Sequence, residues 1–214
     1  MFCDLDGVLL DVSERYFRVH CDIVGAIGAA RLDKAAYWRL KREAAPLAEV
    51  LRRSGCAASD VAPYRRQWRE RIETAAYLRT DVVIAGAVEA LRALMPRHPL
   101  VLVTLRQRAD GLQRQLKALA LTALFAEVLV APPPPTAAWR TKKMLIRASR
   151  VFAWNAVVVG DTEVDIRAGK ALGVTTVGVL SGIRSRARLA AEAPDHLLAS
   201  LETLGAVMEE RPRR

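Results

Sequence analysis

Short apolar runs rich in β-branched residues predict the strands of this chain. They cover residues 99–104, 128–130, 156–160 and 175–180, with a weaker run at 82–85. Runs that are apolar at nearly every position are typical of parallel strands buried on both faces of a sheet. Helical patterns alternate with these runs, over residues 86–95, 110–119, 141–149 and 165–172. The alternation predicts the α/β class, with a doubly wound parallel sheet.

Residues 12–79 break this rhythm because their apolar positions recur only at helical spacing. The segment carries three apolar stripes: Tyr16, Val19, Ile23 and Ile27, then Leu40, Leu47 and Leu51, then Val61, Tyr64, Trp68 and Ile72. We therefore expect a helical insertion with a turn near 55–59 and a return hinge near 79–81. Farther along, the proline run 132–135 lacks the backbone donors of a helix or a central strand and predicts a stiff extended spacer.

Composition narrows the class of protein. The chain has 214 residues, about half of them apolar, which is enough for one core and a small second lobe. It has no apolar run long enough for a membrane span, and acidic residues stand at positions 4 and 6, where a signal peptide would be apolar. We therefore expect a cytoplasmic protein with no membrane partner. The three cysteines lack the spacing of a zinc or redox motif, which predicts reduced thiols.

The net charge of +10 allows two interpretations. A positive field attracts anionic metabolites or nucleic acid, and arginines of the insertion, such as Arg15, Arg18, Arg39 and Arg42, are compatible with an anionic substrate. The same arginines are equally compatible with solvated helix faces.

Four aspartates stand at the ends of predicted strands. Asp4 and Asp6 follow a short apolar run, and their spacing places both on one side of an extended strand end. Asp161 directly follows the run 156–160, and Asp165 comes one turn into the next helix. The carboxyl ends of strands form the ligand crevice of an open α/β sheet, so we expect these carboxylates to meet there. Such a cluster needs a neutralising cation, and oxygen-only ligands suit Mg²⁺.

Other polar residues near the predicted crevice could hold a phosphate group. Thr104 ends a strand, and its hydroxyl and the backbone N–H of Leu105 suit a phosphate oxygen, although a helix cap is an alternative. Lys142 or Lys143 could hold phosphate as a point charge or lie in solvent. Arg106 either contacts phosphate or lies in solvent.

The same segments, in this order, resemble the motifs of the haloacid dehalogenase superfamily. They read Asp4-Leu5-Asp6-Gly7-Val8-Leu9, Val103-Thr104-Leu105, a lysine at 142 or 143, and Gly160-Asp161-Thr162-Glu163-Val164-Asp165. Four motifs in order are far more specific than any one alone. The helical insertion and residues 168–179 are similar to the phosphoglycolate-phosphatase-like branch. This resemblance implies an α/β core domain of residues 1–11 and 80–214 and a helical cap domain of residues 12–79. It also implies a central first strand, and because only three residues precede Asp4, we expect a start farther upstream.

The resemblance also implies a role for each residue. Asp4 would be the nucleophile that forms an aspartyl phosphate, and Asp6 the general acid and then the base. Mg²⁺ would be held by Asp4, the backbone carbonyl of Asp6 and Asp161, with Asp165 as a ligand through water or as a brace for the lysine. The phosphate would be bound by Thr104, the Leu105 N–H and Lys142, with Lys143 as the alternate. An aspartate at position 6 favours phosphoryl chemistry over dehalogenation.

We therefore expect a Mg²⁺-dependent phosphatase whose partner is a small-molecule phosphate ester. A sugar-phosphate mutase on the same scaffold is an alternative. A phosphonate-cleaving enzyme would need a cap lysine for an imine, and Lys34 and Lys41 are available but resemble helix-face charges. The other alternative is a non-catalytic module that binds phosphate or nucleic acid. We do not expect nucleic-acid binding, because a binding module gains little from keeping a nucleophile and an acid/base together.

Overall fold

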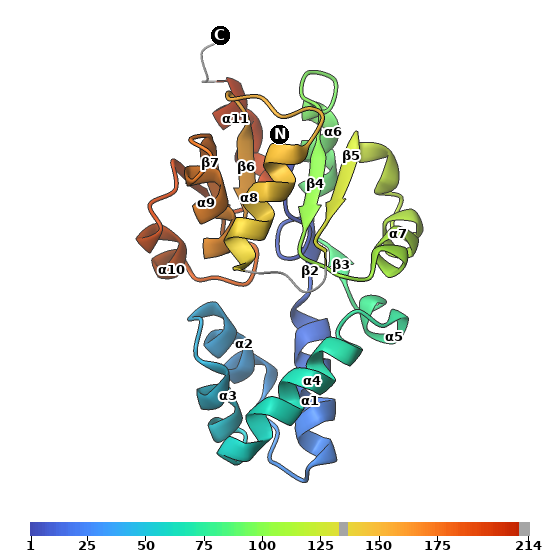
Figure 1. Ribbon diagram of the computed structural model, residues 1–214, viewed down its shortest axis with the longest axis vertical. Coiled ribbons are helices and arrows are strands. Elements are labelled where there is room, and N and C mark those ends of the chain that lie inside the picture. The colour runs from blue at the N-terminus through green and yellow to red at the C-terminus, as the bar shows by residue number, and fades with distance from the viewer. Residues whose placement is uncertain (133–136, 210–214) are drawn as a thin grey trace.

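The computed structural model describes residues 1–132 and 137–209, and its centre is a six-stranded sheet (Figure 1). The strands lie in the order β5-β4-β1-β6-β7-β8, and every neighbouring pair is parallel. Their bounds are β1 (Phe2–Cys3), β4 (Val101–Thr104), β5 (Glu127–Val130), β6 (Val157–Gly160), β7 (Thr175–Val179) and β8 (His196–Leu198). The predicted α/β class and parallel sheet are confirmed, although β8 was not predicted. The predicted proline spacer lies outside the described residues except for Pro132.

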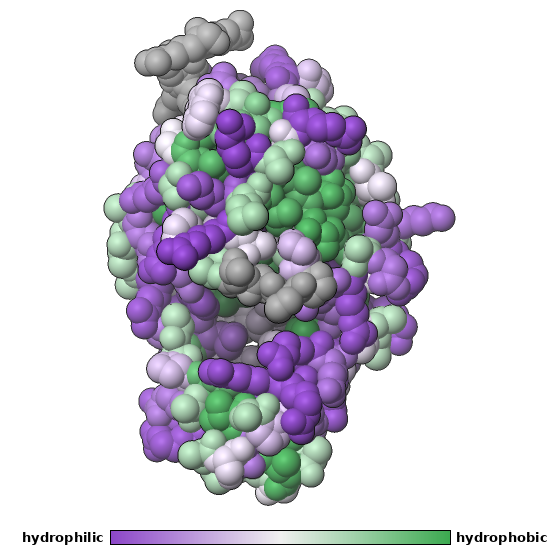
Figure 2. Space-filling view, viewed as in Figure 1, coloured by the Kyte–Doolittle hydropathy of each residue, from purple (hydrophilic) through white to green (hydrophobic). Residues whose placement is uncertain are grey.

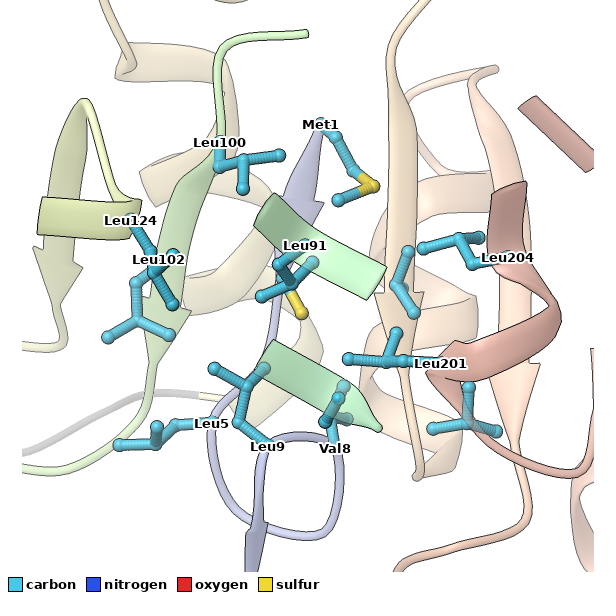
Figure 3. Packing of buried hydrophobic residues seen from close by; sticks show 14 of the residues in the cluster. Met1, Leu5, Val8, Leu9, Leu91, Leu100, Leu102, Leu124, Leu201 and Leu204 are labelled. Carbon is cyan, nitrogen blue, oxygen red and sulfur yellow. The ribbon is translucent and has the colours of Figure 1, made fainter. Parts of the chain in front are cut away.

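Alternate residues of the strands pack on opposite faces of the sheet, as a period of two requires. Phe2, Val101 and Val158 belong to one apolar cluster, which includes Ile146 and Ala168 from two covering helices. The residues that follow each of the three strand positions belong to a second cluster on the other face (Figure 3): Cys3, Leu102 and Val159, with Leu91, Leu201 and Leu204. Burial on both faces explains why the strands are apolar at nearly every position.

Helices cover both faces of the sheet. Their bounds are α6 (Ala87–Leu94), α7 (Ala109–Ala118), α8 (Ala138–Ala148), α9 (Glu163–Lys170), α10 (Arg186–Ala191) and α11 (Leu204–Glu209). The four predicted helices correspond to α6 to α9, with ends that differ by a few residues. Among the described residues, no helix combines the length and the apolar character needed to cross a membrane. We call the sheet and these helices the sheet lobe.

The remaining helices form a second lobe, which Figure 1 shows on the far side of the strand ends. This helical lobe comprises α1 (Ser13–Ala26), α2 (Lys34–Arg42), α3 (Leu47–Arg53), α4 (Val61–Arg71) and α5 (Ala75–Leu78). The apolar stripes meet inside it, since Val19, Ile23, Leu51 and Tyr64 form one buried cluster. Ile27 does not join them: α1 ends at Ala26, and the Ile27 side chain is exposed. Helices α1 to α5 all lie within residues 12–79. That residues 12–79 form a domain of their own stays a prediction.

Two short strands join the lobes and correct one expectation. The run 82–85 was expected to add a strand to the main sheet, but β3 (Val82–Val83) pairs antiparallel with β2 (Leu10–Asp11) instead. Val82 is 63% exposed, so β3 lacks the two-sided burial of a central strand. The pair forms where the chain leaves the sheet lobe and where it returns, which makes it the hinge between the lobes.

Candidate active site

Three neighbouring strands bring the predicted site residues to one edge of the sheet. Thr104 ends β4, Asp4 follows β1, and Asp161 follows β6, and these strands lie side by side. All three residues line a cavity of about 740 Å³ that also touches α1, α2 and α4. Figure 2 shows the surface hollowed between the two lobes, with hydrophilic residues around the hollow. The crevice predicted from strand ends is therefore closed on its far side by the helical lobe.

Glycines allow the acidic residues to approach each other. Gly7 has a φ of +81°, and a Cβ there would lie 2.0 Å from Oδ2 of Asp161. A Cβ at Gly160 would lie 2.0 Å from Cγ of Asp165. At Gly7 the positive φ is itself a reason for glycine, because other residues adopt it only with strain. The structure adds a second reason for glycine, because both positions make room for a carboxylate.

Asp4, Asp161 and Asp165 form a compact acidic group. One carboxylate oxygen from each lies within 4.8 Å of the others. Oδ2 of Asp161 accepts the backbone N–H of Ile183 at 2.6 Å, whereas its Oδ1 is buried and has no hydrogen-bond partner among the described residues. Burial raises the pKa of Asp161, and the charges of Asp4 and Asp165 raise it further. A buried oxygen without a partner, amid three carboxylates, fits a divalent cation bound through oxygen ligands.

Lys142 on α8 lies between two of these carboxylates. Its Nζ is 3.0 Å from Oδ2 of Asp4 and also pairs with Oδ1 of Asp165. Burial alone would lower the pKa of Lys142, but Asp165 and Asp4 outweigh burial and raise it. Lys143, the alternate, is half-buried and does not line the cavity. Of the two lysines, the structure therefore brings Lys142 to the acidic group.

Asp165 is held in place by the first turn of its own helix. Its Oδ2 accepts both the backbone N–H of Thr162 at 3.2 Å and the Thr162 hydroxyl at 2.7 Å. This arrangement caps the N-terminus of α9. With its other oxygen on Lys142, Asp165 has the contacts expected of a brace for the lysine, while it also stays within the acidic group.

Thr104 and Leu105 leave polar groups at the cavity. Oγ1 of Thr104 accepts the backbone N–H of Arg106 at 3.2 Å, so the hydroxyl proton is free to point elsewhere. In the described part of the chain, the backbone N–H of Leu105 has no hydrogen-bond acceptor. Both residues line the cavity beside Asp4. The position suits an anion that needs two donors.

Asp6 lies in a different environment, paired with two arginines. Nη2 of Arg15 is 2.7 Å from Oδ2 of Asp6, and Nη2 of Arg106 pairs with Oδ1. Burial would raise the pKa of Asp6, but Arg106 and Arg15 outweigh burial and hold it well below its usual range. The side chain of Asp6 lies outside the acidic group of Asp4, Asp161 and Asp165. The expectation that the backbone carbonyl of Asp6 would serve as a metal ligand stays a prediction.

Two arginines are buried at the cavity, which contradicts the solvent-exposed interpretation that the sequence allowed for each. Arg106 was expected on phosphate or in solvent, and Arg15 on substrate or on a solvated face, yet both are buried against carboxylates. Their shared partner is Asp81 in the hinge, 3.0 Å from Nε of Arg15 and 3.2 Å from Nη2 of Arg106. Gln115 also donates to Asp81 at 2.8 Å. Their pairing depends on how the lobes meet, which no local pattern encodes.

A comparison with protein-family models gives one match to this chain. The model described as HAD-hydrolase-like matches residues 137–204, about a third of the chain. A comparison with curated protein sequences found no match.

Solved structures resemble nearly the whole chain. A haloacid dehalogenase-like hydrolase from Streptococcus pneumoniae superposes with a TM-score of 0.81 at 18% identity, covering 97% of this chain and 96% of that one. The chain has the haloacid-dehalogenase-like fold. A protein described as a predicted phosphoglycolate phosphatase from Haemophilus somnus also superposes on this chain, with a TM-score of 0.75 at 18% identity, covering 97% of this chain and 96% of that one. A candidate β-phosphoglucomutase from Thermotoga maritima gives 0.69 at 19% identity, with 99% and 98% covered. The resemblance predicted from the sequence is thus confirmed.

The region matched by the family model covers only part of the candidate site. Residues 137–204 include Lys142, Asp161 and Asp165 but neither Asp4 nor Thr104. The other half of the site is joined to it by contacts, since Asp4 pairs with Lys142 and its backbone N–H bonds to the carbonyl of Val159 at 3.0 Å. Both halves therefore belong to one cavity.

Some residues of the cavity were not predicted as site residues. Tyr16 and Trp68 line it, although their spacing indicated only the apolar stripes of the helical lobe. Lys41 lines it too, whereas Lys34, on the same helix, pairs with Glu14 at the surface. Helical spacing of aromatic residues does not distinguish a core position from a cavity wall. The sequence pattern lacks the information about which helix faces of the helical lobe are turned toward the strand ends.

Proposed function

We propose that this chain is a Mg²⁺-dependent phosphomonoesterase that works through an aspartyl phosphate on Asp4. One observation carries the proposal: Asp4 lies with Asp161, Asp165 and Lys142 beside two unused donors, the Thr104 hydroxyl and the Leu105 N–H. A nucleophile, an anion-binding pair and a cation-binding group are the parts that phosphoryl transfer requires. The likeness to proteins described as phosphatases supports the same class of reaction.

In the proposed reaction, a carboxylate oxygen of Asp4 attacks phosphorus and the bond from phosphorus to the leaving oxygen breaks. Water then attacks phosphorus of the aspartyl phosphate, which releases inorganic phosphate and regenerates the Asp4 carboxylate. Lys142, the Thr104 hydroxyl and the Leu105 N–H bind the phosphate oxygens as charge develops on them. Mg²⁺ would be held by Asp4, Asp161, Asp165 and the backbone carbonyl of Asp6, and it would supply charge neutralisation for the carboxylates and the phosphate.

Asp6 is proposed to exchange protons with the leaving group and the water. Its pairs with Arg15 and Arg106 favour the ionised carboxylate, which is the form that accepts a proton from the attacking water. Donation to the leaving oxygen is disfavoured by the same pairs. We therefore expect esters whose leaving oxygen needs little protonation, such as aryl phosphates, to react fastest.

A sugar-phosphate mutase is the second candidate, favoured by the likeness to a candidate β-phosphoglucomutase. It differs in the fate of the aspartyl phosphate, which would return its phosphoryl group to a sugar instead of to water. A phosphatase releases one inorganic phosphate for each alcohol, whereas a mutase releases no inorganic phosphate. Measurement of both products therefore distinguishes the two reactions.

The test is hydrolysis of 4-nitrophenyl phosphate with and without Mg²⁺. We expect turnover that depends on Mg²⁺ and a loss of at least about a thousandfold in Asp4→Asn, because removal of a nucleophile leaves only binding and electrostatic effects. Asp110→Asn is the matched control, since Asp110 is an exposed aspartate paired with Arg114 on the surface of α7. Full activity in Asp4→Asn, or no turnover in the wild type across a panel of phosphate esters, would overturn the proposal.

A further inference from the structure

The helical lobe contains a second pocket that adjoins the active-site cavity. Its volume is about 290 Å³, and three residues, Lys41, Trp68 and Arg69, line both it and the cavity. Most of its other lining residues are apolar or aromatic: Tyr37, Ala45, Leu47, Val50 and Tyr64, with Arg65 at the edge. Because it adjoins the cavity that Thr104 and Lys142 line, it is a candidate site for the organic part of a substrate.

Three aromatic residues in mutual contact connect the linings of the two spaces. Trp68 is stacked on Tyr64, with ring centroids 5.8 Å apart and an interplanar angle of 22°. On its other side Trp68 meets the edge of Tyr16, at 5.2 Å and 75°. Tyr64 lines the second pocket and Tyr16 lines the active-site cavity. The three rings therefore extend from one lining to the other, where a flat apolar group could contact them.

Hydrogen bonds between buried side chains hold Tyr64 in place. We call Tyr64, Trp68 and Tyr16 the aromatic wall. The hydroxyl of Tyr64 is 3.1 Å from Nδ1 of His20, and Nε2 of His20 is 3.1 Å from Oγ of Ser54. Ser54 donates to the carbonyl of Val50 at 3.1 Å, so the tautomer of His20 that donates from Nε2 satisfies every member. His20 also stacks on Tyr37, with ring centroids 4.5 Å apart. A wall that is fixed before binding reduces the entropy lost when a ligand binds.

Lys41 is a cation without an anionic partner at the junction of the two spaces. Its Nζ lies 5.3 Å from the ring centroid of Tyr16 and 5.8 Å from that of Trp68. Among the described residues, no carboxylate forms an ion pair with it. Burial and the charge of Arg184 lower the pKa of Lys41 to about 8, against a weaker opposite effect of Glu163. An anion that binds beside a half-buried ammonium in this position would stabilise its charged form.

We propose that the leaving group of the substrate is a planar aromatic ring with an anionic substituent, which lies along Tyr64, Trp68 and Tyr16 with its anion on Lys41. This inference rests on the proposed phosphomonoesterase function, because it assigns the second pocket to the group that leaves with the ester oxygen. Arg69, exposed and also without an ion-pair partner in the described ranges, adds positive charge at the same junction. A short alkyl acid would reach Lys41 without using the rings, and a neutral ring would leave Lys41 without an anion.

Three phosphate esters separate these contributions: phenyl phosphate, 4-carboxyphenyl phosphate and 3-carboxypropyl phosphate. In the wild type we expect the KM for 4-carboxyphenyl phosphate to be at least fivefold lower than for the other two. Lys41→Met is expected to remove this preference by raising that KM, with kcat changed less than twofold. Trp68→Leu is expected to raise the KM of both aryl esters and to leave that of the alkyl ester unchanged. Lys34→Met is the matched control, a lysine of the same helix that pairs with Glu14 at the surface.

A binding measurement keeps this inference separate from the proposed function. Calorimetry with 4-hydroxybenzoate, which carries the ring and the anion but no phosphate, requires no turnover. We expect binding to the wild type, to Asp4→Asn and to Lys34→Met with equal affinity, and at least tenfold weaker binding to Lys41→Met. If this pattern appears while no phosphate ester is hydrolysed, the phosphatase proposal fails and the aromatic anion site stands. If 4-hydroxybenzoate does not bind, or binds Lys41→Met as well as the wild type, the inference is overturned whatever the enzyme hydrolyses.

Discussion

The buried polar groups of the two lobes are stabilised in opposite ways. At the strand ends of the sheet lobe they are carboxyl groups crowded against other charges, and their pKa values are driven apart: burial raises that of Asp161, while two arginines lower that of Asp6. In the core of the helical lobe, away from the cavity, the buried polar group around His20 is neutral, since burial lowers the pKa of His20 to about 4 and Tyr64 and Ser54 are its hydrogen-bond partners. The neutral chain of His20, Ser54 and Tyr64 is therefore complete by itself, whereas Asp161 in the sheet lobe has an oxygen without a hydrogen-bond partner among the described residues.

This difference indicates where ligands act. A buried charge that is only partly compensated costs free energy, and a bound cation or phosphate can recover that free energy. The neutral chain around His20 gains nothing from a ligand, so its role is to shape the aromatic wall. Lys41, a cation of the helical lobe with no ion-pair partner in the described ranges, lies at the cavity. Charge imbalance and proposed function thus occur together.

Removal of the buried cation tests the charged side of this comparison and has the largest expected effect. In Lys142→Met we expect kcat/KM for 4-nitrophenyl phosphate to fall by about 10²–10³, because one preorganised donor to the transition state is lost. Lys143→Met, one residue along the same helix, is expected to keep kcat/KM within about twofold of the wild type. Steady-state kinetics at saturating Mg²⁺ measures both.

Two further observations guard this test against misfolding. Lys142→Arg keeps a cation between Asp4 and Asp165 and is expected to retain more activity than Lys142→Met. Circular dichroism reports whether each variant is folded. Should Lys143→Met lose the activity while Lys142→Met keeps it, the assignment of the phosphate-binding lysine is wrong.

Acid titration tests the neutral side of the comparison. The pKa of His20 falls from its ordinary value of 6.5 to about 4, mainly through burial and secondarily through Lys41. Between these values the unfolded chain binds the proton more readily than the folded one, so the stabilisation is present above pH 6.5 and is lost as the pH falls toward 4. From pH 7.5 to 4.5 we expect the His20 contribution to the free energy of unfolding to fall by about 2–3 kcal/mol.

Other groups titrate in the same range, so the measurement is a difference. Urea unfolding of the wild type and of His20→Gln, followed by tryptophan fluorescence at both pH values, isolates the effect of the imidazole. The wild type should lose more stability than the variant. A difference between the two proteins that stays constant with pH would show that His20 is not held neutral.

The parts of the fold that were predicted correctly depend on local pattern. The runs 99–104 and 156–160 are apolar throughout because β4 and β6 are buried on both faces, and such a signal needs no knowledge of neighbours. Residues at the ends of these strands follow directly, so Asp4, Thr104 and Asp161 were predicted to share a crevice. Residues 82–83 show the limit, since an equally β-branched run pairs in the hinge.

The parts that were not predicted depend on contacts between distant segments. Arg15 and Arg106 are far apart along the sequence, with most of the helical lobe between them. Nothing in the residues around either one indicates that both contact Asp81. Lys41 and Trp68 have the spacing of ordinary helix residues, and only the orientation of the helical lobe makes them cavity residues. A pattern along the chain reports which face of a helix is apolar but not what that face meets.

The hinge network joins the two lobes and is the place where the comparison can be sharpened with the smallest effect. Arg15 belongs to α1, Asp81 to the returning chain, and Arg106 and Gln115 to the sheet lobe, so both crossings meet at one buried carboxylate. In a double-mutant cycle of Arg15→Met and Asp81→Asn, we expect a coupling of about 1–2 kcal/mol in the free energy of unfolding. Each single change leaves a buried charge with one partner fewer, whereas the double change removes both charges.

The surface pair of Arg18 and Glu14, on the same helix α1, is the control cycle, with an expected coupling of at most about 0.5 kcal/mol. Urea unfolding of the seven proteins, the wild type, four single variants and two double variants, measures both couplings. If the hinge pair is as additive as the surface pair, Asp81 is not a shared anchor, and the charged arrangement of the sheet lobe ends at the cavity without reaching the hinge.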